Sequence, residues 1–364
     1  MAKPPKTSSR KVTQAMIARE AGVSQTLVSL VLSSASSPER VAEETRRRII
    51  EVAQQLGYAT RSGGGRQKTL ALILPVVSRE EQLGSSIYAA IDDFYARTQS
   101  YVAEAAYRKG YSLIVRFYEH PTELTHWLTE WDVDGVLWHA SDEKLLEWIA
   151  ERYPTAQLHL GPITAATDIV TASQEEIPLV ALRYLYAKGH RRICFVPGAG
   201  WGKVAKMRTE AFRDAASAKG LPLYELFLNE AMPTSSQEIV GNCLRLLELP
   251  EGERPTVFVL GDPFALALAK EVQQRGMSIP GDVSIVGIDN LSAGALYNPA
   301  ITSIDVCQRE VSETAVAMLV ERIANPDKRF QKIYISPNII ERNSVATLKV
   351  PDTTASVPVR KARH

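Results

Sequence analysis

The sequence predicts a small all-α helix-turn-helix headpiece followed by a larger α/β body, made of two doubly wound parallel-sheet subdomains with a central cleft. Apolar residues near the start of the 364-residue chain recur at helical spacing. From residue 69 onward, apolar strands alternate with helical segments. A glycine-rich stretch separates these two regions. We therefore expect a helix-turn-helix domain at 12–57, a linker at 58–68 and a body at 69–348.

The headpiece begins with two short amphipathic helices between residues 12 and 33. Their apolar positions are separated by gaps of three, four and one. Between them, Gly22 can adopt the positive φ that a tight helix-to-helix turn needs. Ser24 stands where a side-chain oxygen would cap the second helix. This order of elements is typical of a motif that lays its second helix in the DNA major groove.

A third amphipathic helix is expected at 41–56, with Arg46, Arg47 and Arg48 on its exposed face. Without it, the first two helices are equally consistent with an ordinary helical hairpin at the start of a globular domain. With it, three helices can share one apolar centre, although a unit of this size is only marginally stable.

The segments VTQAMIAREAGVSQTLVSLVLS and VAEETRRRIIEVAQQLGY resemble the DNA-binding headpiece of the LacI/GalR family of bacterial transcription regulators. Further along the chain, KGYSLIV, DGVLW, KGHRRICFVPG, MSIPGDVSIVGIDN and YNPAITSID resemble that family's periplasmic-binding-protein-like body. The resemblance implies a cytoplasmic, nucleoid-associated homodimer that represses transcription from a palindromic double-stranded DNA operator. It also implies a small-molecule effector that alters the operator affinity.

The resemblance places the base-reading residues at the start of the second helix, at Gln25 and Thr26. A glutamine can pair bidentately with adenine, while serine and threonine bind phosphates or base edges. Leu30 departs from the arginine that many relatives carry, so the familiar operator code does not apply. The full set of DNA-contact candidates is Lys11, Thr13, Ser24, Gln25, Thr26, Ser29, Leu30, Arg40, Thr45 and Arg46.

The linker is the clearest departure from the family pattern. Relatives usually continue with a proline and a hinge helix, whereas this chain reads ATRSGGGRQKT. Three consecutive glycines cost about 3 kcal/mol of helix propensity relative to alanine. We therefore expect a flexible linker without an apolar wedge for the minor groove. The basic arm at 1–11 and the tail at 349–364 are expected to be disordered.

Charge is distributed unevenly between the two regions. Residues 1–68 hold 12 lysines and arginines against 5 acidic residues, whereas the rest holds 30 against 36. This asymmetry favours binding of a polyanion through the headpiece. No apolar run reaches the roughly 18 residues of a membrane span, so no membrane partner is expected. The cysteines, Cys194, Cys243 and Cys307, are expected to be reduced core thiols.

The body reads as two successive strand–helix series. Strands are expected at 69–77, 111–118, 134–141, 156–162, 168–173, 192–198, 256–262 and 282–290. Helices are expected at 91–109, 124–131, 145–152, 177–188, 206–219, 236–247 and 264–275. We assign about 69–165 and 300–325 to a first subdomain, and about 166–299 and 326–348 to a second.

Ligands of open α/β sheets bind beyond the carboxyl ends of the strands, so residues there are candidates for an effector site. The resemblance supplies an aromatic pair, a ligand-binding arginine and two aspartates. An arginine, carboxylates and aromatic faces suit a small polar ring such as a sugar or a nucleobase. Core packing or an ion pair is the alternative for each residue. The candidates are Phe94, Tyr95, Trp138, His139, Trp201, Arg208, Asp262 and Asp289.

Enzymatic and metal signatures are weak. The loop PGAGWGKV lacks the glycine and the hydroxyl residue of a phosphate-binding loop, and neither HExxH nor GxSxG occurs. We expect no catalytic residue, cofactor or metal. Two alternative functions stay open: a sugar-binding receptor, and a cleft hydrolase that would use Asp262 and Asp289 as an acid/base pair.

Overall fold

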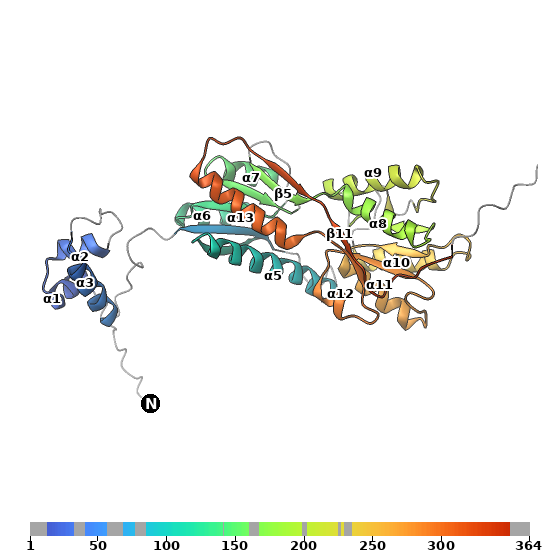
Figure 1. Cartoon of the computed structure of the whole chain (residues 1–364), viewed down its shortest axis with the longest axis horizontal. Coiled ribbons are helices and arrows are strands. Elements are labelled where there is room, and N and C mark those ends of the chain that lie inside the picture. Colours follow the sequence, from blue (N-terminus) through green and yellow to red (C-terminus); the bar gives the residue numbers. More distant parts are fainter. Residues whose placement is uncertain are drawn as a thin grey trace, which may run out of the picture. The chain divides into compact units, whose positions relative to one another are not determined.

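The chain divides into two compact units, residues 1–69 and residues 70–364 (Figure 1). The basic arm, the linker apart from Lys68, and the tail beyond residue 349 lie outside the described residues. The computed structural model describes residues 13–32, 41–56, 68–76, 85–140, 142–159, 167–198, 202–224, 227–228 and 235–349.

The first unit is the expected three-helix headpiece, with α1 (Gln14–Glu20), α2 (Gln25–Leu32) and α3 (Glu43–Gln55). The axes of α1 and α2 meet at 111°, within the range of helix-turn-helix motifs. Gly22 adopts φ +64° in the turn, and the Ser24 hydroxyl accepts the Leu27 amide at 3.2 Å. The shared core consists of Ile17, Ala18, Ala21, Val28, Val31, Ile49 and Ala53.

Among the described residues, no single helix is long and apolar enough to cross a membrane. The helices α1 and α2 reach that length and apolarity only when the bent pair is counted as one segment.

The first subdomain of the body contains a six-stranded sheet in the order β10-β5-β4-β3-β1-β2. Its strands are β1 (Thr69–Pro75), β2 (Ser112–Tyr118), β3 (Gly135–Trp138), β4 (Thr155–Leu158), β5 (Asp168–Ala172) and β10 (Lys332–Ile335). Its helices are α5 (Ser85–Arg108), α6 (Pro121–Glu130), α7 (Glu143–Ala150) and α13 (Gln308–Ala324).

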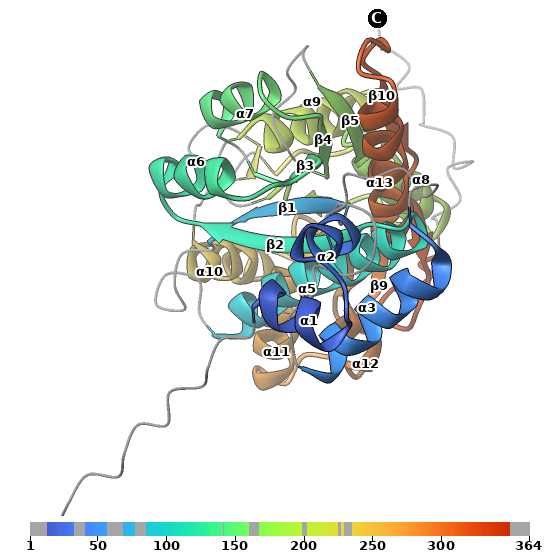
Figure 2. The same cartoon turned by 90° about the vertical axis from the view of Figure 1, so that its left-hand side faces the viewer.

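Both faces of this sheet are covered, as Figure 2 shows. Along β1, Leu70, Leu72 and Leu74 pack under α5 and α13, whereas Ala71 and Ile73 pack under α6 and α7. Successive strand residues point to opposite faces, and in a parallel sheet both faces are apolar. The strands therefore carry near-continuous apolar runs.

The second subdomain contains a five-stranded sheet in the order β11-β9-β8-β7-β6, antiparallel only at β11–β9. Its strands are β6 (Ile193–Phe195), β7 (Val257–Val259), β8 (Ser284–Ile288), β9 (Thr302–Asp305) and β11 (Asn338–Ile340). Helices α8 (Glu176–Ala187) and α9 (Lys203–Ser217) cover one face, and α10 (Ser236–Leu247) and α11 (Asp262–Gln274) the other. The short α12 (Ser292–Leu296) follows β8.

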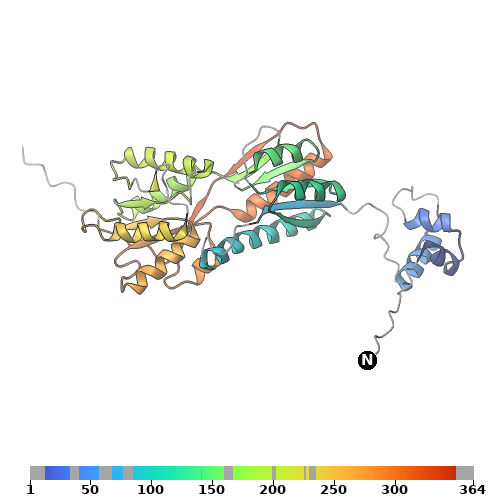
Figure 3. The same ribbon diagram turned by 180° about the vertical axis from the view of Figure 1, so that it is seen from behind.

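The assignment of the segment boundaries to the two subdomains was wrong at three strands. β5 and β10 pair with each other in the first sheet, with Lys332 opposite Ile169, while β9 lies in the second sheet. Alternation along the chain reveals that strands follow one another, but it does not reveal which distant strand each one pairs with. The chain consequently passes between the subdomains three times, after β5, after β9 and after β10 (Figure 3).

The second of these crossovers contains Cys307, which adopts φ +52°. Its thiol is half-buried, unlike those of Cys194 and Cys243, which are buried in the core as expected. The expectation of a core thiol was therefore wrong for Cys307, because residues that link two subdomains lie beside the cores and not within them.

Candidate functional site

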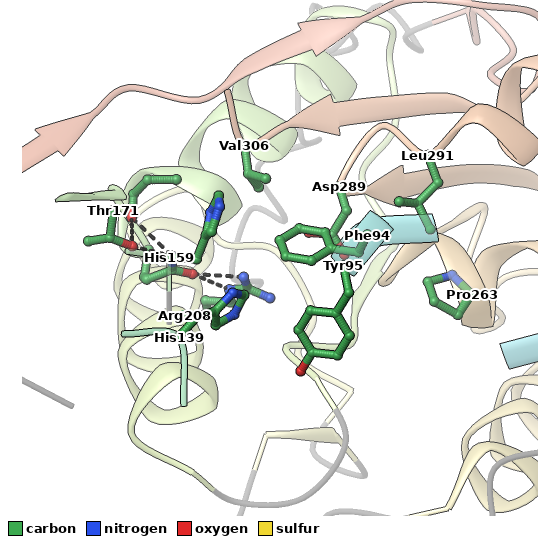
Figure 4. A pocket seen from close by; sticks show the side chains of 12 residues that line it. Phe94, Tyr95, His139, His159, Thr171, Arg208, Pro263, Asp289, Leu291 and Val306 are labelled. Carbon is green, nitrogen blue, oxygen red and sulfur yellow. Dashed lines mark hydrogen bonds between the residues drawn. The ribbon is translucent and has the colours of Figure 1, made fainter. Parts of the chain in front are cut away.

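A cavity of about 250 Å³ lies between the two subdomains, at the carboxyl ends of the strands. Both subdomains and two of the crossovers contribute to its lining (Figure 4). The lining residues are Phe94, Tyr95, His139, His159, Thr171, Ala172, Gln174, Arg208, Pro263, Asp289, Leu291 and Val306.

The wall from the first subdomain is aromatic. Phe94 and Tyr95 lie on α5, while His139 and His159 directly follow β3 and β4. The Phe94 ring lies edge-on to both imidazoles, with centroid distances of 5.9 Å to His139 and 5.2 Å to His159. The two imidazole centroids are 5.1 Å apart, and the Tyr95 centroid is 5.4 Å from that of His139. Such geometries are favoured between aromatic rings.

Burial keeps both imidazoles uncharged. It lowers the pKa of His139 to about 4. The pKa of His159 is lowered by burial first and then by the neighbouring His139. Among the described residues neither ring has a hydrogen-bond partner, and His139 Nδ1 and His159 Nε2 are fully buried.

The wall from the second subdomain carries Arg208, which is buried on α9. Its Nε and Nη2 donate to Gln174 Oε1 at 3.0 and 2.7 Å, and its Nη1 donates to the Pro197 carbonyl at 3.0 Å. Gln174 in turn donates to the Ala172 carbonyl at 3.0 Å. Burial lowers the pKa of Arg208, and the charge of Asp289 raises it. The guanidinium is thus fixed before any ligand binds.

Asp289 follows β8 and is half-buried in the cavity wall. Its backbone has φ +100°, a conformation that L-residues rarely adopt, and its amide donates to the Ile304 carbonyl at 2.9 Å. Burial raises the pKa of Asp289, while Arg208 and then Arg97 lower it. Within the described part of the chain, its carboxyl has no hydrogen-bond partner.

Asp262 does not line the cavity. It is buried in the first turn of α11, where its carboxyl accepts the Ser303 hydroxyl at 2.8 Å and the Leu291 amide at 2.5 Å. Ser303 Oγ also accepts the Asn290 amide at 3.0 Å, so Asp262 anchors the loop that carries Asp289. Burial, and then the charge of Asp289, raise the pKa of Asp262 to about 8.

The role of ligand contact that we expected for Asp262 is therefore replaced by a positioning role, because both of its oxygens are occupied by protein donors. Trp138 also lies away from the cavity. It is fully buried between β3 and the helices α6 and α7, and it stacks on Tyr118 at 5.7 Å. Trp201 lies outside the described residues.

Five of the eight sequence candidates thus line one cavity: Phe94, Tyr95, His139, Arg208 and Asp289. His159 and Gln174 were missed. His159 could have been found, because it directly follows the buried run of β4. Gln174 lies on a crossover, which only the pairing of β5 identifies.

In the headpiece, Thr13, Ser24, Gln25 and Thr26 are exposed. Ser29, Leu30, Thr45 and Arg46 are partly buried, and Lys11 and Arg40 lie outside the described residues. The start of α2 therefore presents polar side chains to solvent, while Val28 and Val31 face the headpiece core.

Two family models match the chain. Residues 13–61 match the model described as bacterial regulatory proteins, lacI family, and residues 182–345 match a periplasmic binding protein-like domain. These matches follow the division between the headpiece and the body.

The HTH-type transcriptional repressor PurR of Vibrio parahaemolyticus is 29% identical over 342 residues, covering 91% of this chain and 98% of the relative. PurR of Aliivibrio fischeri is 28% identical over 340 residues, covering 90% and 97%.

Solved structures share the fold. The Lac repressor dimer bound to operator and the anti-inducer ONPF superposes with a TM-score of 0.70 at 19% identity, covering 93% of this chain and all of that one. The complex of the transcriptional regulator CelR with cellobiose gives a TM-score of 0.63 at 22% identity, covering 92% and 99%. With both parts in the family's order and repressors matching along nearly its whole length, the chain belongs to the LacI/GalR family of bacterial transcription regulators.

Proposed function

We propose that this protein is a transcriptional repressor that binds an operator through its headpiece and changes its operator affinity when an effector enters the cavity of the body. The observation that carries the proposal is the exposed polar start of α2, held by the Ser24 cap and the Gly22 turn at 111° to α1. A helix supported in this way is suited to enter a major groove.

Within the headpiece, Gln25 and Thr26 are assigned to base edges, together with Ser29 and Leu30 at the margin of the contact. Backbone phosphates are assigned to the remaining candidates: Lys11, Thr13, Ser24, Arg40, Thr45 and Arg46. Phosphate contacts supply affinity that falls with salt, and base contacts supply sequence preference.

A single headpiece reads too few base pairs for a unique site, so we infer a homodimer on a palindromic operator. The Lac repressor binds its operator as a dimer, which supports the same arrangement here. As a DNA-binding regulator of bacteria, the protein is assigned to the cytoplasm.

The effector response is assigned to a change in subdomain closure. In the structure the subdomains are tied across the cavity region by Arg97 Nη1 donating to the Asn290 carbonyl at 2.7 Å and by an ion pair between Lys203 and Glu143. The Ser292 amide also donates to Asp93 at 3.2 Å. A ligand that contacts both walls would stabilise this closed arrangement over an open one.

The first test is selection of a binding site from a random duplex library, followed by gel-shift titration. We expect a palindromic site whose affinity falls steeply with salt. The substitution Gln25→Ala should weaken that site about 10- to 100-fold, as expected for one lost base contact. Arg47→Ala is the matched control, because Arg47 is exposed and, within the described headpiece residues, forms only a surface pair with Glu51 at 3.8 Å. Binding without sequence preference would overturn the proposal.

The effector site has its own test in the same preparation. Arg208→Ala and Asp289→Ala should both abolish the stabilisation by small molecules while leaving operator affinity unchanged, because neither residue belongs to the headpiece. An unchanged ligand response in both variants would contradict the assignment of the cavity.

A further inference from the structure

We propose that His139 and His159 form an uncharged recognition edge, and that this edge selects an effector with a flat, uncharged aromatic ring carrying hydrogen-bonding groups on one side. Phenols, aromatic amides and nitrogen heterocycles belong to this class. The inference rests on the proposed function, because it names the chemical class of the effector for the same cavity.

The first support is the unpaired state of the two imidazoles. Both residues are 5% exposed and line the cavity, yet neither ring has a hydrogen-bond partner among the described residues. A buried polar group without a partner costs free energy, so native structures rarely contain one without a reason. Two such groups with centroids 5.1 Å apart on one cavity wall indicate a ligand that supplies both partners.

His190 shows what a structural histidine looks like in this chain. Its Nδ1 lies 2.8 Å from the Thr256 hydroxyl, and its Nε2 lies 3.1 Å from the Ala346 carbonyl. Both nitrogens are satisfied far from the cavity. The same side chain is thus fully paired where it supports the fold and unpaired where it lines the cavity.

The second support is the charge balance of the cavity. Arg208 and Asp289 carry opposite charges and interact with each other, while both histidines are kept neutral by burial. A neutral imidazole offers one donor and one acceptor. The edge can therefore bind an N–H or O–H group beside a carbonyl or ring nitrogen, without adding net charge to a buried site.

The third support is shape. Phe94, Tyr95 and the two imidazoles surround one side of the cavity, and Pro263, Leu291 and Val306 add apolar surface. Rings and apolar side chains favour a flat aromatic molecule. The volume of about 250 Å³ holds one or two rings. A sugar of that size would need a polar partner for each hydroxyl, and this wall offers few.

The test is a thermal-shift and calorimetric panel on the full chain with named probes at millimolar concentration. The aromatic probes are catechol, nicotinamide and uracil, and the sugar probes are ribose, glucose and cellobiose. We expect at least one aromatic probe to raise the melting temperature and none of the sugars to do so.

Substitutions distinguish the contribution of each aromatic ring to probe affinity from that of its nitrogens. His139→Phe and His159→Phe keep an aromatic ring but remove the hydrogen-bonding groups, and each should weaken the best probe at least tenfold without lowering the melting temperature of the free protein. His126→Phe is the matched control, since His126 is exposed on α6 and its ring pairs, among the described residues, with Glu130 alone. Unchanged affinity in both cavity variants would overturn the proposal, as would a panel in which only sugars bind or no aromatic probe binds.

Operator binding is measured on the same samples, so the two hypotheses can fail separately. An aromatic probe that binds without altering operator affinity would contradict the proposed effector response and leave the inference standing. A sugar that binds and alters operator affinity would contradict the inference and leave the proposed effector response standing.

Discussion

The two walls of the cavity differ in how their polar side chains are held in place. On the second-subdomain wall, the functional groups are held by the protein itself, through three hydrogen bonds to Arg208 and through the Asp262 anchor of the Asp289 loop. On the first-subdomain wall, the imidazole rings of His139 and His159 are held by ring packing, without a hydrogen-bond partner among the described residues.

This difference teaches how one cavity can be preorganised and still respond to a ligand. A preformed charged wall reduces the ordering cost of binding. An unsatisfied wall leaves hydrogen-bonding energy that only a ligand can recover. A ligand that pairs with both walls then stabilises the closed arrangement of the two subdomains, which is the step that an effector response requires.

The largest expected effect on stability comes from removing the Asp262 carboxyl, which anchors the loop that carries Asp289. Asp262→Ala leaves the Leu291 amide and the Ser303 hydroxyl without their acceptor, and two unpaired buried donors together cost about 2–4 kcal/mol. The Asp289 loop should loosen with it, so ligand binding weakens too. Chemical denaturation of the wild type and the variant measures the first effect, and calorimetry with the best probe measures the second.

Asp262→Asn is the control, because it retains an acceptor oxygen and removes the charge. The pKa of Asp262 is raised to about 8 in the folded protein, above its unfolded value near 3.8, so folding favours the protonated carboxyl. Wild-type stability should therefore fall, relative to Asp262→Asn, as the pH rises from about 4 to 8. A difference that is constant over this range would contradict the burial of a titrating carboxyl at this position.

The headpiece could be predicted closely from the sequence because its determinants are local. The Gly22 turn, the Ser24 cap and the apolar spacing all act within a few residues of one another, and the structure confirms each of them. The alternating strands and helices of the body were likewise visible, because their apolar runs are continuous.

The rest depends on residues that are distant in the chain. Membership of β10 in the first sheet depends on its pairing with β5, more than 150 residues away. The role of Asp262 depends on Ser303, 41 residues away. Trp138 and His139 are adjacent, and both faces of a parallel sheet are apolar, so the sequence does not distinguish the core-facing residue from the cavity-facing one.

A smaller effect is expected from Gln174→Ala, which removes the acceptor of two Arg208 hydrogen bonds. Hydrogen bonds to a charged group contribute about 1.5–3 kcal/mol, and water entering from the cavity should recover part of this. We therefore expect a loss of about 1–2 kcal/mol of stability and about tenfold weaker binding of the best probe. Gln174→Glu retains the acceptor and should restore most of the binding. Equal losses in both variants would show that Gln174 does not position Arg208.

The smallest expected effect distinguishes a core residue, Trp138, from the neighbouring cavity residue, His139. Trp138 belongs to the core, and its Nε1 has no partner among the described residues, so Trp138→Phe removes packing without stranding a hydrogen bond. The smaller ring should cost about 1 kcal/mol of stability, less than the 3–5 kcal/mol of a change to alanine, and leave probe affinity unchanged. His139→Phe should do the opposite and reduce probe affinity at little cost in stability. Denaturation and calorimetry on the two variants side by side measure both quantities. Successive strand residues point to opposite sides, so Trp138 should face the core and His139 the cavity. Weaker probe binding in Trp138→Phe would contradict this assignment.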